Sequence, residues 1–326
     1  MEDKIFSVTE ANFEQLALEV FHFQYAHNPV YQLWVNTLGV NVEKIESIEH
    51  IPFLPISFFK SHKVISTVFE PEFIFESSGT TGIVNSHHYV KSARIYEESF
   101  LRGFELFYGD PEKYVVLGLL PSYLERKNSS LIVMVDSLIA KSGRKESGFY
   151  LYDHTGLEKL LIELAQKNQP VILIGVTFAL LDFATNRELF LPQTIVMETG
   201  GMKGRRQELT REEIHSILKK SFHVQHIHSE YGMTELLSQA YAKADGIFRT
   251  PPWMKIILRD EEDPLSLKST LDSQPGKGVI NVIDLANLYS CSFIATDDLG
   301  TVHENGFSVT GRLDKSDLRG CSLLTI

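Results

Sequence analysis

The chain has 326 residues, of which 43% are hydrophobic and 22% charged, and its formal net charge is −11. This length and composition are typical of a folded protein with a sizeable core, and the acidic balance argues against a nucleic-acid partner. Only two cysteines occur, Cys291 and Cys321, which excludes a disulfide scaffold and favours a reducing compartment. No signal-type region or bilayer-length apolar run is present. We therefore expect a cytoplasmic globular protein with no membrane span.

The first half of the chain predicts two helices and a strand. Apolar residues at helical spacing follow Thr9, and Pro29 is expected to end that first helix. Ser92 is placed to cap a second amphipathic helix. Residues 113–120 predict a strand, while the apolar stretch 131–135 fits either a strand or a buried helix.

The middle of the chain predicts parallel β-structure covered by helices. The patterns Thr155-x-x-Glu158 and Thr210-x-x-Glu213 each resemble a capping box that opens a helix. The buried-strand run 171–175 follows the first of these helices. This alternation of strand, helix and strand indicates a parallel sheet with helices on its faces.

The last quarter of the chain predicts a different kind of structure. Short alternating apolar runs are separated by turn residues, which predicts a smaller antiparallel β subdomain. The expected fold class is therefore α/β, with mainly parallel, helix-covered sheets and this smaller antiparallel subdomain. We expect an α/β core in residues 1–250, a small β subdomain in 251–311, and a hinge with a short tail in 312–326.

A loop rich in glycine and hydroxyl residues follows the apolar-leaning run 73–75. Glycine lets the backbone approach an anion closely, its turn N–H groups form a positive nest, and hydroxyls donate to phosphate oxygens. Taken alone, such a cluster is more often an ordinary surface loop. The pattern is not a Walker A loop. The candidate phosphate-binding residues are Ser77, Ser78, Gly79, Thr80, Thr81 and Gly82.

Two further stretches suit a nucleotide. Gly200 and Gly201 form a glycine turn after a strand-like run, where a flat ligand can lie against bare backbone. The sequence YGMTE places Tyr231, Thr234 and Glu235 close together. These side chains supply stacking for a base, a hydroxyl donor for phosphate and a carboxylate ligand for Mg²⁺.

Two stretches near the end of the chain add charged groups. The sequence TDDLG at 296–300 offers a carboxylate, from Asp297 or Asp298, at the expected end of a strand, able to accept hydrogen bonds from both hydroxyls of a ribose. In the sequence GRLD at 311–314, Arg312 adds a guanidinium group suited to phosphate or ribose oxygens.

The motifs SSGTTG, YGMTE, TDDLG and GRLD occur in this order, and together they resemble the motif set of the adenylate-forming superfamily. This superfamily contains acyl-CoA synthetases, luciferases and the adenylation domains of peptide synthetases. The resemblance implies that ATP and Mg²⁺ are used. It also implies that residues 77–82 hold the ATP phosphates, Gly200 and Gly201 flank the adenine, Tyr231 stacks on it beside Gly232, Thr234 contacts the α-phosphate, Glu235 binds Mg²⁺, Asp298 takes the ribose, and Arg312 reaches ribose or phosphate.

The sequence departs from the superfamily pattern in two places. The phosphate loop of the superfamily usually continues with Pro-Lys-Gly, whereas the sequence IVN follows Gly82 here. The chain ends at Ile326, shortly after the expected hinge at Asp314. We therefore expect that the mobile C-terminal lid domain of the superfamily, with its catalytic lysine, is absent.

This shortened layout resembles one branch, the LuxE-type acyl-protein synthetases, which also fits the pairs IP at 51–52 and FK at 59–60 and the sequence SDLRGC at 316–321. The resemblance implies that a carboxylic acid, in particular a fatty acid, is activated as acyl-AMP and transferred to a protein cysteine. Cys321 occupies the matching position. An acyl-accepting protein or a partner reductase would then receive the acyl group.

Plainer interpretations stay open for several residues. Cys321 is also compatible with a small buried residue, and Cys291 is interpreted as structural. His223, His226 and His228 are interpreted as structural histidines, because no matching carboxylate or cysteine spacing accompanies them. Two other functions are open as well: an acyl-CoA ligase of the phenylacetate-activating type, and a non-catalytic nucleotide- or acyl-binding relative.

Overall fold

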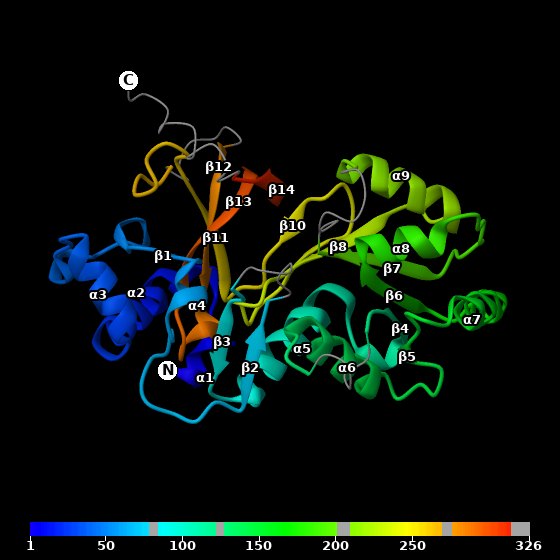
Figure 1. Cartoon of the computed structure of the whole chain (residues 1–326), viewed down its shortest axis with the longest axis horizontal. Helices are drawn as coiled ribbons and strands as arrows, with labels where there is room; N and C mark the ends of the chain where they lie inside the picture. Colours follow the sequence, from blue (N-terminus) through cyan, green and yellow to red (C-terminus); the bar gives the residue numbers. More distant parts are fainter. Residues whose placement is uncertain (78–83, 122–126, 201–208, 269–275, 314–326) are drawn as a thin grey trace, which may run out of the picture.

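The computed structural model of the chain describes residues 1–77, 84–121, 127–200, 209–268 and 276–313. Within these residues, one sheet of twelve strands organises the molecule (Figure 1). One part of this sheet is parallel with helices on both faces, and the other part is antiparallel. The predicted α/β fold class is confirmed, with the difference that the parallel and antiparallel parts belong to one continuous sheet.

The parallel part begins at the centre of the sheet and runs to one edge. Its strands are parallel because helices connect them, as the alternating pattern in the middle of the sequence predicts. Their order from the centre is β8 (Ile227–Tyr231), β7 (Thr194–Thr199), β6 (Val171–Val176), β4 (Val115–Leu119) and β5 (Gly148–Phe149).

Helices cover both faces of the parallel part because its strands are apolar on both sides. In β4, Val115 and Leu117 pack with one group of helices, whereas Val116 packs with the other. The first group consists of α7 (His154–Gln166), α8 (Thr177–Ala184) and α9 (Arg211–Phe222), and the second contains α5 (Ala93–Tyr108) and α6 (Ser130–Ser142) (Figure 1).

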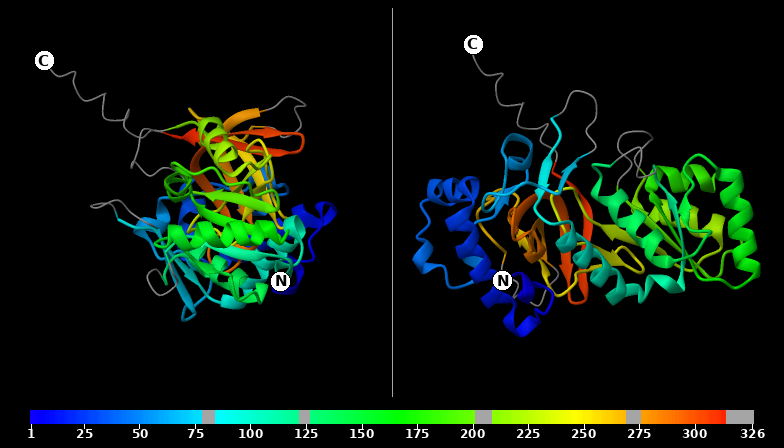
Figure 2. Two further views of the ribbon diagram at one scale, coloured as in Figure 1. Left: turned by 90° about the vertical axis from the view of Figure 1, so that its right-hand side faces the viewer. Right: turned by 90° about the horizontal axis from the view of Figure 1, so that it is seen from below.

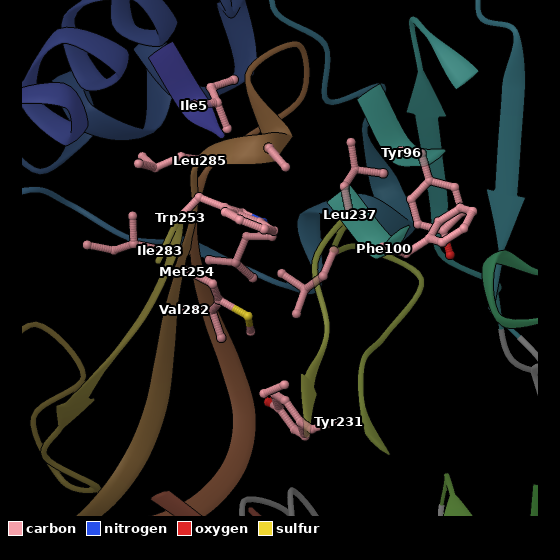
Figure 3. Close-up of a cluster of buried hydrophobic side chains, with 14 of the residues drawn as sticks. Ile5, Tyr96, Phe100, Tyr231, Leu237, Trp253, Met254, Val282, Ile283 and Leu285 are labelled. Atoms are coloured by element: carbon pink, nitrogen blue, oxygen red, sulfur yellow. The ribbon is translucent and has the colours of Figure 1, made fainter. Parts of the chain in front are cut away.

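The antiparallel part continues the sheet from the free side of β8. Figure 3 shows the apolar cluster by which it packs against the helix that carries Tyr96 and Phe100, with Leu237 and Trp253 in the cluster. The strands follow in the order β9 (Ala240–Ala242), β10 (Phe248–Arg249), β14 (Gly306–Arg312), β13 (Phe293–His303), β12 (Gly276–Asp284) and β11 (Met254–Arg259). The division of the chain at residue 250 stays a prediction.

The N-terminal helices pack against the antiparallel part, at the opposite end of the molecule from α7 (Figures 1 and 2). The ring of Phe293 in β13 contacts the rings of Phe21, Tyr31 and Phe53. The elements of this region are α1 (Glu2–Ile5), α2 (Glu10–His27), α3 (Pro29–Thr37), η1 (Val42–Lys44), η2 (Ile48–His50), β1 (Leu54–Pro55), which pairs in parallel with β13, and α4 (Phe58–Ser61).

Three short elements complete the description. A hairpin of β2 (Phe73–Glu76) and β3 (His87–Val90) brackets the predicted phosphate loop. The 3₁₀ helices η3 (Pro111–Lys113) and η4 (Leu285–Asn287) precede β4 and follow β12. Among the described residues, none of the helices combines the length and the apolar character that crossing a bilayer requires.

Most sequence-based expectations for individual elements are confirmed, and some need correction. Residues 131–135 belong to a helix, α6, which resolves the open alternative. Pro29 does not only end α2: it is the first residue of α3, because proline lacks the N–H group that the first helical turn leaves unpaired anyway. The box at Thr210 is confirmed, whereas the one at Thr155 is wrong, since α7 starts at His154 and the side chain of Asp153 caps it.

Candidate active site

Three of the predicted site residues, one each from β8, β13 and β14, are joined by hydrogen bonds of their side chains. The hydroxyl of Tyr231, the last residue of β8, donates to Oδ2 of Asp298 at 2.9 Å. Nε of Arg312 donates to Oδ1 of the same carboxylate at 2.8 Å. Asp298 and Arg312 are cross-strand partners of β13 and β14. The expectation that Asp298 ends a strand is wrong, because β13 continues to His303.

The carboxylate of Asp298 receives one donor from the protein interior and one from the solvent side. Asp298 is 5% exposed, whereas the side chain of Arg312 is 77% exposed. Burial, together with the charge of Asp298, raises the pKa of Tyr231 well above its usual value, so this hydroxyl keeps its proton and donates it. A carboxylate offers about four acceptor positions, so these two donors leave room for the hydroxyls of a ribose.

The aromatic ring of Tyr231 is covered by protein. Its centroid lies 5.8 Å from that of Phe248 and 5.4 Å from that of Phe307, with tilted and nearly perpendicular rings. Only 8% of the residue is exposed, and Figure 3 shows it at the edge of the apolar cluster. Little of the ring is open to a base in this arrangement, and its stacking on adenine stays a prediction.

Glu235 lies against the base of the predicted phosphate loop. It belongs to the irregular segment 232–239 between β8 and β9 and is 6% exposed. The hydroxyl of Ser86 is close enough to lower the pKa of its carboxyl group. The main-chain N–H of Ser86 donates to Oγ of Ser77 at 2.9 Å, and the N–H of Ser77 donates to the Ser86 carbonyl at 3.1 Å. Ser77 and Ser86, on either side of residues 78–83, are therefore held to each other, with the Ser86 hydroxyl near Glu235.

The surroundings of Glu235 suit a divalent cation that a nucleotide shares. Burial raises the pKa of Glu235, and the Ser86 hydroxyl and the charges of Arg312 and Lys60 oppose that rise. A bound cation favours the charged form of such a carboxyl group. Mg²⁺ is commonly held by one or two carboxylates together with substrate phosphates. Across the described part of the chain, no three His, Cys, Asp or Glu residues gather into a metal site by themselves.

Two predicted glycines occupy positions that other residues fit poorly. Gly200 follows β7 with a φ of +70°, in the left-handed region that favours glycine. A Cβ atom on Gly232 would lie 2.3 Å from Oε1 of Glu230. The hydroxyl of Thr177 donates to the Gly200 carbonyl at 2.5 Å, which fixes the start of the turn.

Glu198 lies at the carboxyl end of β7 and is surrounded by donors. It accepts a hydrogen bond from the hydroxyl of Ser229 at 2.8 Å, and Oγ1 of Thr177, whose single proton also faces the Gly200 carbonyl, lies 2.9 Å from its Oε2. Nε of Arg211 and Nε2 of His215 lie 3.6 and 3.7 Å from its Oε1. Burial acts to raise the pKa of Glu198, but the nearby donors and cations outweigh burial, and the pKa is lower than usual. This carboxyl group is charged at neutral pH.

Glu230, on the neighbouring strand β8, has a pKa shifted in the opposite direction from that of Glu198. Burial raises its pKa to about 7, and the charge of Glu198 adds to this rise, while the hydroxyl of Thr199, which is hydrogen-bonded to the carboxyl group, opposes it. The two carboxyl groups of β7 and β8 therefore differ in protonation, with Glu198 charged and Glu230 titrating near neutral pH.

Some residues at this site were not among the predicted ones. Ser86 has no linear signal, because only the β2–β3 hairpin returns it to Ser77. Lys60, whose charge acts on Glu235, stands in the FK pair at 59–60, which the LuxE resemblance singled out without a role. Arg211 links the two parts of the sheet by donating to the Val309 carbonyl at 3.2 Å while facing Glu198.

The structure describes two of the remaining predicted residues, Thr234 and Cys291, whereas others lie outside the described part of the chain. Thr234 is half-buried, and its carbonyl oxygen lies 2.8 Å from Nδ1 of His88. Cys291 is fully buried, and burial raises the pKa of its thiol to about 12, which fits a structural residue. The predicted residues that lie outside the described ones are Ser78, Gly79, Thr80, Thr81, Gly82, Gly201 and Cys321.

Comparison with solved structures identifies the fold. An ATP-bound RpMatB-BxBclM chimera superposes with a TM-score of 0.55 at 15% identity, over 76% of this chain and 49% of that chain. A fatty acyl-adenylate ligase from L. pneumophila, solved with acyl adenylate and pyrophosphate, superposes with a TM-score of 0.52 at 16% identity, over 79% and 53%. The fold is that of adenylate-forming enzymes. The chain spans about half the length of these solved structures.

Sequence comparison identifies the family within this class. Residues 6–325 match the family described as "Acyl-protein synthetase, LuxE". The chain belongs to this family of acyl-activating ligases. It is also 23% identical to the long-chain-fatty-acid–luciferin-component ligase of Aliivibrio fischeri, over 95% of this chain and 86% of that protein. The LuxE resemblance seen in the motifs is confirmed.

Proposed function

We propose that this chain uses ATP and Mg²⁺ to activate a fatty acid as acyl-AMP and then transfers the acyl group to a cysteine thiol. The observation that carries the proposal is the contact of Tyr231, Asp298 and Arg312, which brings three motifs of the sequence to one point. Membership of the LuxE family and similarity to a ligase named for long-chain fatty acids support the choice of acid.

The residues divide the proposed work between the two parts of the sheet. Asp298 accepts the ribose hydroxyls and Arg312 faces ribose or phosphate, both from the antiparallel part. Glu235 supplies a carboxylate for Mg²⁺, which offsets charge on the phosphates when bound. The Thr234 hydroxyl donates to the α-phosphate, and residues 77–82, with Gly200, Gly201 and Gly232, complete the nucleotide site.

The proposed reaction has two steps. In the first, a carboxylate oxygen of the acid attacks the α-phosphorus of ATP, a new P–O bond forms, and pyrophosphate leaves with the electrons of the broken bond. In the second, a thiolate attacks the acyl carbonyl carbon, AMP leaves, and the thiol proton passes to solvent. A mixed anhydride is reactive toward a thiolate, and the thioester product keeps the acyl group available for a partner protein, such as a reductase.

Cys321 is the proposed acyl acceptor. It is the sixth residue from the end of the sequence, in the part that matches the family. A thiol tethered to the enzyme has a high effective concentration at acyl-AMP. The other cysteine, Cys291, is an unsuitable nucleophile because it is buried and its pKa is raised to about 12.

The first step is tested by ATP–pyrophosphate exchange with a panel of carboxylic acids that includes short, aromatic and long-chain members. We expect exchange that depends on both Mg²⁺ and a long-chain acid. Nucleotide binding without exchange for any acid would instead identify a non-catalytic binding protein and reject the proposal.

The second step is tested with labelled long-chain acid, ATP and Mg²⁺. The parent protein should form an acyl-protein that hydroxylamine cleaves, and Cys321→Ser should keep pyrophosphate exchange but lose this adduct. Cys291→Ala is the matched control and should keep both. Transfer of the label to coenzyme A in place of the protein would support the acyl-CoA ligase alternative.

A further inference from the structure

Two buried side chains hold the main chain of Thr234 and Glu235, and neither belongs to the predicted site. Nδ1 of His88, in β3, lies 2.8 Å from the carbonyl oxygen of Thr234. Nδ2 of Asn287, at the end of η4, donates to the carbonyl oxygen of Glu235 at 2.8 Å. His88 is 1% exposed and Asn287 is fully buried. Two distant parts of the chain therefore hold two consecutive carbonyl groups.

The irregular segment 232–239 needs such partners. It contains no regular helix or strand, and beside one turn hydrogen bond, from the N–H of Leu236 to the carbonyl of Met233, its buried N–H and C=O groups use side chains as partners. Asp284 accepts from the N–H groups of Leu237 and Ser238, at 2.9 Å each. His88 and Asn287 hold the carbonyl groups at the other end of the same segment.

The contact with Thr234 determines which nitrogen of His88 carries a proton. A carbonyl oxygen only accepts, so Nδ1 must donate. Burial lowers the pKa of His88 to about 4, although the hydrogen bond to Thr234 opposes this shift, and the ring is neutral at pH 7. Nε2 is then an acceptor. The two nitrogens of the His88 ring therefore have different roles. Substitutions that keep only one of these positions can show which of the two matters.

Nε2 of His88 and Oδ1 of Asn287 share a second property. Both atoms are buried and have no hydrogen-bond partner among the described residues. Both residues line one small pocket, in which the volume open to the centre of a water molecule is about 10 Å³. That is room for about one water molecule.

The two side chains are themselves firmly placed. His88 is the ladder partner of Phe75, and its ring meets that of Phe59 edge to face, with centroids 5.8 Å apart. The main-chain carbonyl of Asn287 accepts from Nε2 of Gln24 at 2.9 Å. A side chain fixed in this way can transmit its position to the carbonyl group that it holds.

We propose that His88 and Asn287 are positioning residues that fix the Thr234 hydroxyl and the Glu235 carboxylate by holding the main-chain carbonyl groups of these two residues. This inference rests on the proposed function, because it assigns to the two residues the orientation of groups that serve the α-phosphate and Mg²⁺. Neither His88 nor Asn287 touches the reacting atoms.

Three substitutions of His88 test the donating side of the ring. His88→Phe removes the donor, His88→Asn places an amide N–H near the position of Nδ1, and His88→Gln places its polar atoms near Nε2. We expect His88→Phe and His88→Gln to lower kcat of pyrophosphate exchange by about tenfold or more, with a smaller change in KM for ATP. His88→Asn should restore most of the rate. Equal rates for the Asn and Gln variants would overturn the proposal.

Asn287 and a control histidine complete the set. Asn287→Leu should lower kcat like His88→Phe, and the double variant should lose less than the product of the two effects, since both act on one segment. His228→Phe is the control, because Nδ1 of His228 faces the Tyr108 hydroxyl and not a carbonyl of the segment. All variants are compared at equal folded fraction, measured by circular dichroism. A kcat loss in His228→Phe as large as that in His88→Phe would contradict a specific role.

One readout does not depend on catalysis. Long-range ¹⁵N–¹H spectra of the intact protein at pH 7 should show His88 neutral and protonated at Nδ1, as the contact with Thr234 requires. A ring protonated at Nε2 alone would overturn the proposed contact of His88 with the Thr234 carbonyl, even in an active enzyme. If no acid supports exchange while this tautomer is found, the proposed function fails and the structural part of the inference stands.

Discussion

At the scale of single residues, the buried carboxylate of Glu235 lowers the stability of the folded protein but is suited to binding a cation. Its pKa is raised, mainly by burial, so its charged form is disfavoured in the folded protein. A carboxyl group with a raised folded pKa destabilises the protein above its unfolded pKa. We therefore expect Glu235→Gln to leave the melting temperature at pH 8 unchanged or higher, while Mg²⁺-dependent pyrophosphate exchange is lost. Exchange at the parental rate would show that Glu235 is not the metal ligand.

Asp298 provides a second prediction, for nucleotide affinity. Charge-assisted hydrogen bonds are worth about 1.5–3 kcal/mol each, so Asp298→Asn should weaken ATP binding by at least about tenfold, as measured by calorimetry. Asp297→Asn is the matched comparison on the adjacent position of β13 and should bind ATP with parental affinity. The reverse pattern would transfer the ribose role to Asp297.

Glu230 provides a prediction about pH. Its folded pKa of about 7 lies above the usual 4.5, so the folded protein binds this proton more tightly than the unfolded chain. The stability that this group contributes is full below pH 4.5 and is lost as pH rises to 7. Glu230→Gln has no such loss, so its stability relative to the parent should rise across this window, by at most about 3 kcal/mol. Urea unfolding at pH 5 and pH 8 measures the difference, and a constant offset at both would reject the raised pKa.

At the scale of secondary-structure elements, helices α7 and α9 show that similar sequence patterns can have different outcomes. Both segments contain Thr-x-x-Glu, but only Thr210 and Glu213 form the reciprocal bonds of a capping box, at 3.2 and 2.7 Å. In α7, Asp153 accepts from the N–H of Gly156 at 2.8 Å and takes the capping position. Asp153, two positions before Thr155, is the residue in the sequence that indicates this cap.

These two helices give a paired prediction. Thr210→Ala and Asp153→Ala should each lower the free energy of unfolding by about 1 kcal/mol, because each leaves helix N–H groups without an acceptor. Thr155→Ala should change it by less than about 0.5 kcal/mol. Chemical denaturation of the three variants measures these values, and a loss for Thr155→Ala equal to that of Thr210→Ala would mean that α7 is capped differently.

At the scale of the whole molecule, Phe293 joins the N-terminal helices to the antiparallel strands. Its ring is fully buried and contacts Phe21, Tyr31 and Phe53. Phe293→Ala should lower the free energy of unfolding by about 3–5 kcal/mol, as large-to-small changes in a packed core do. Phe190→Ala is the control, since Phe190 is 73% exposed and its loss should cost less than about 0.5 kcal/mol. Equal midpoints for the two variants in urea would contradict this core.

The sequence by itself determined the local and repeated features of this protein. The hydrophobic periods predicted α2, α5, β4, β6 and the antiparallel strands β11, β12 and β13, because burial follows the helical and strand repeats directly. The four motifs predicted the superfamily, and the LuxE family is confirmed over residues 6–325. The motifs also nominated Tyr231, Asp298 and Arg312 together, and the structure places these three in contact.

Only the tertiary structure decided which distant groups meet. The register of β13 and β14 places Arg312 opposite Asp298, and the β2–β3 hairpin returns Ser86 to Ser77 and Glu235. The role of Asn287 is invisible in the sequence, because an isolated asparagine carries no periodic or motif signal and its partner is a main-chain carbonyl of a remote segment. Main-chain carbonyl groups are the same at every residue, so a linear sequence cannot show which of them a side chain will hold.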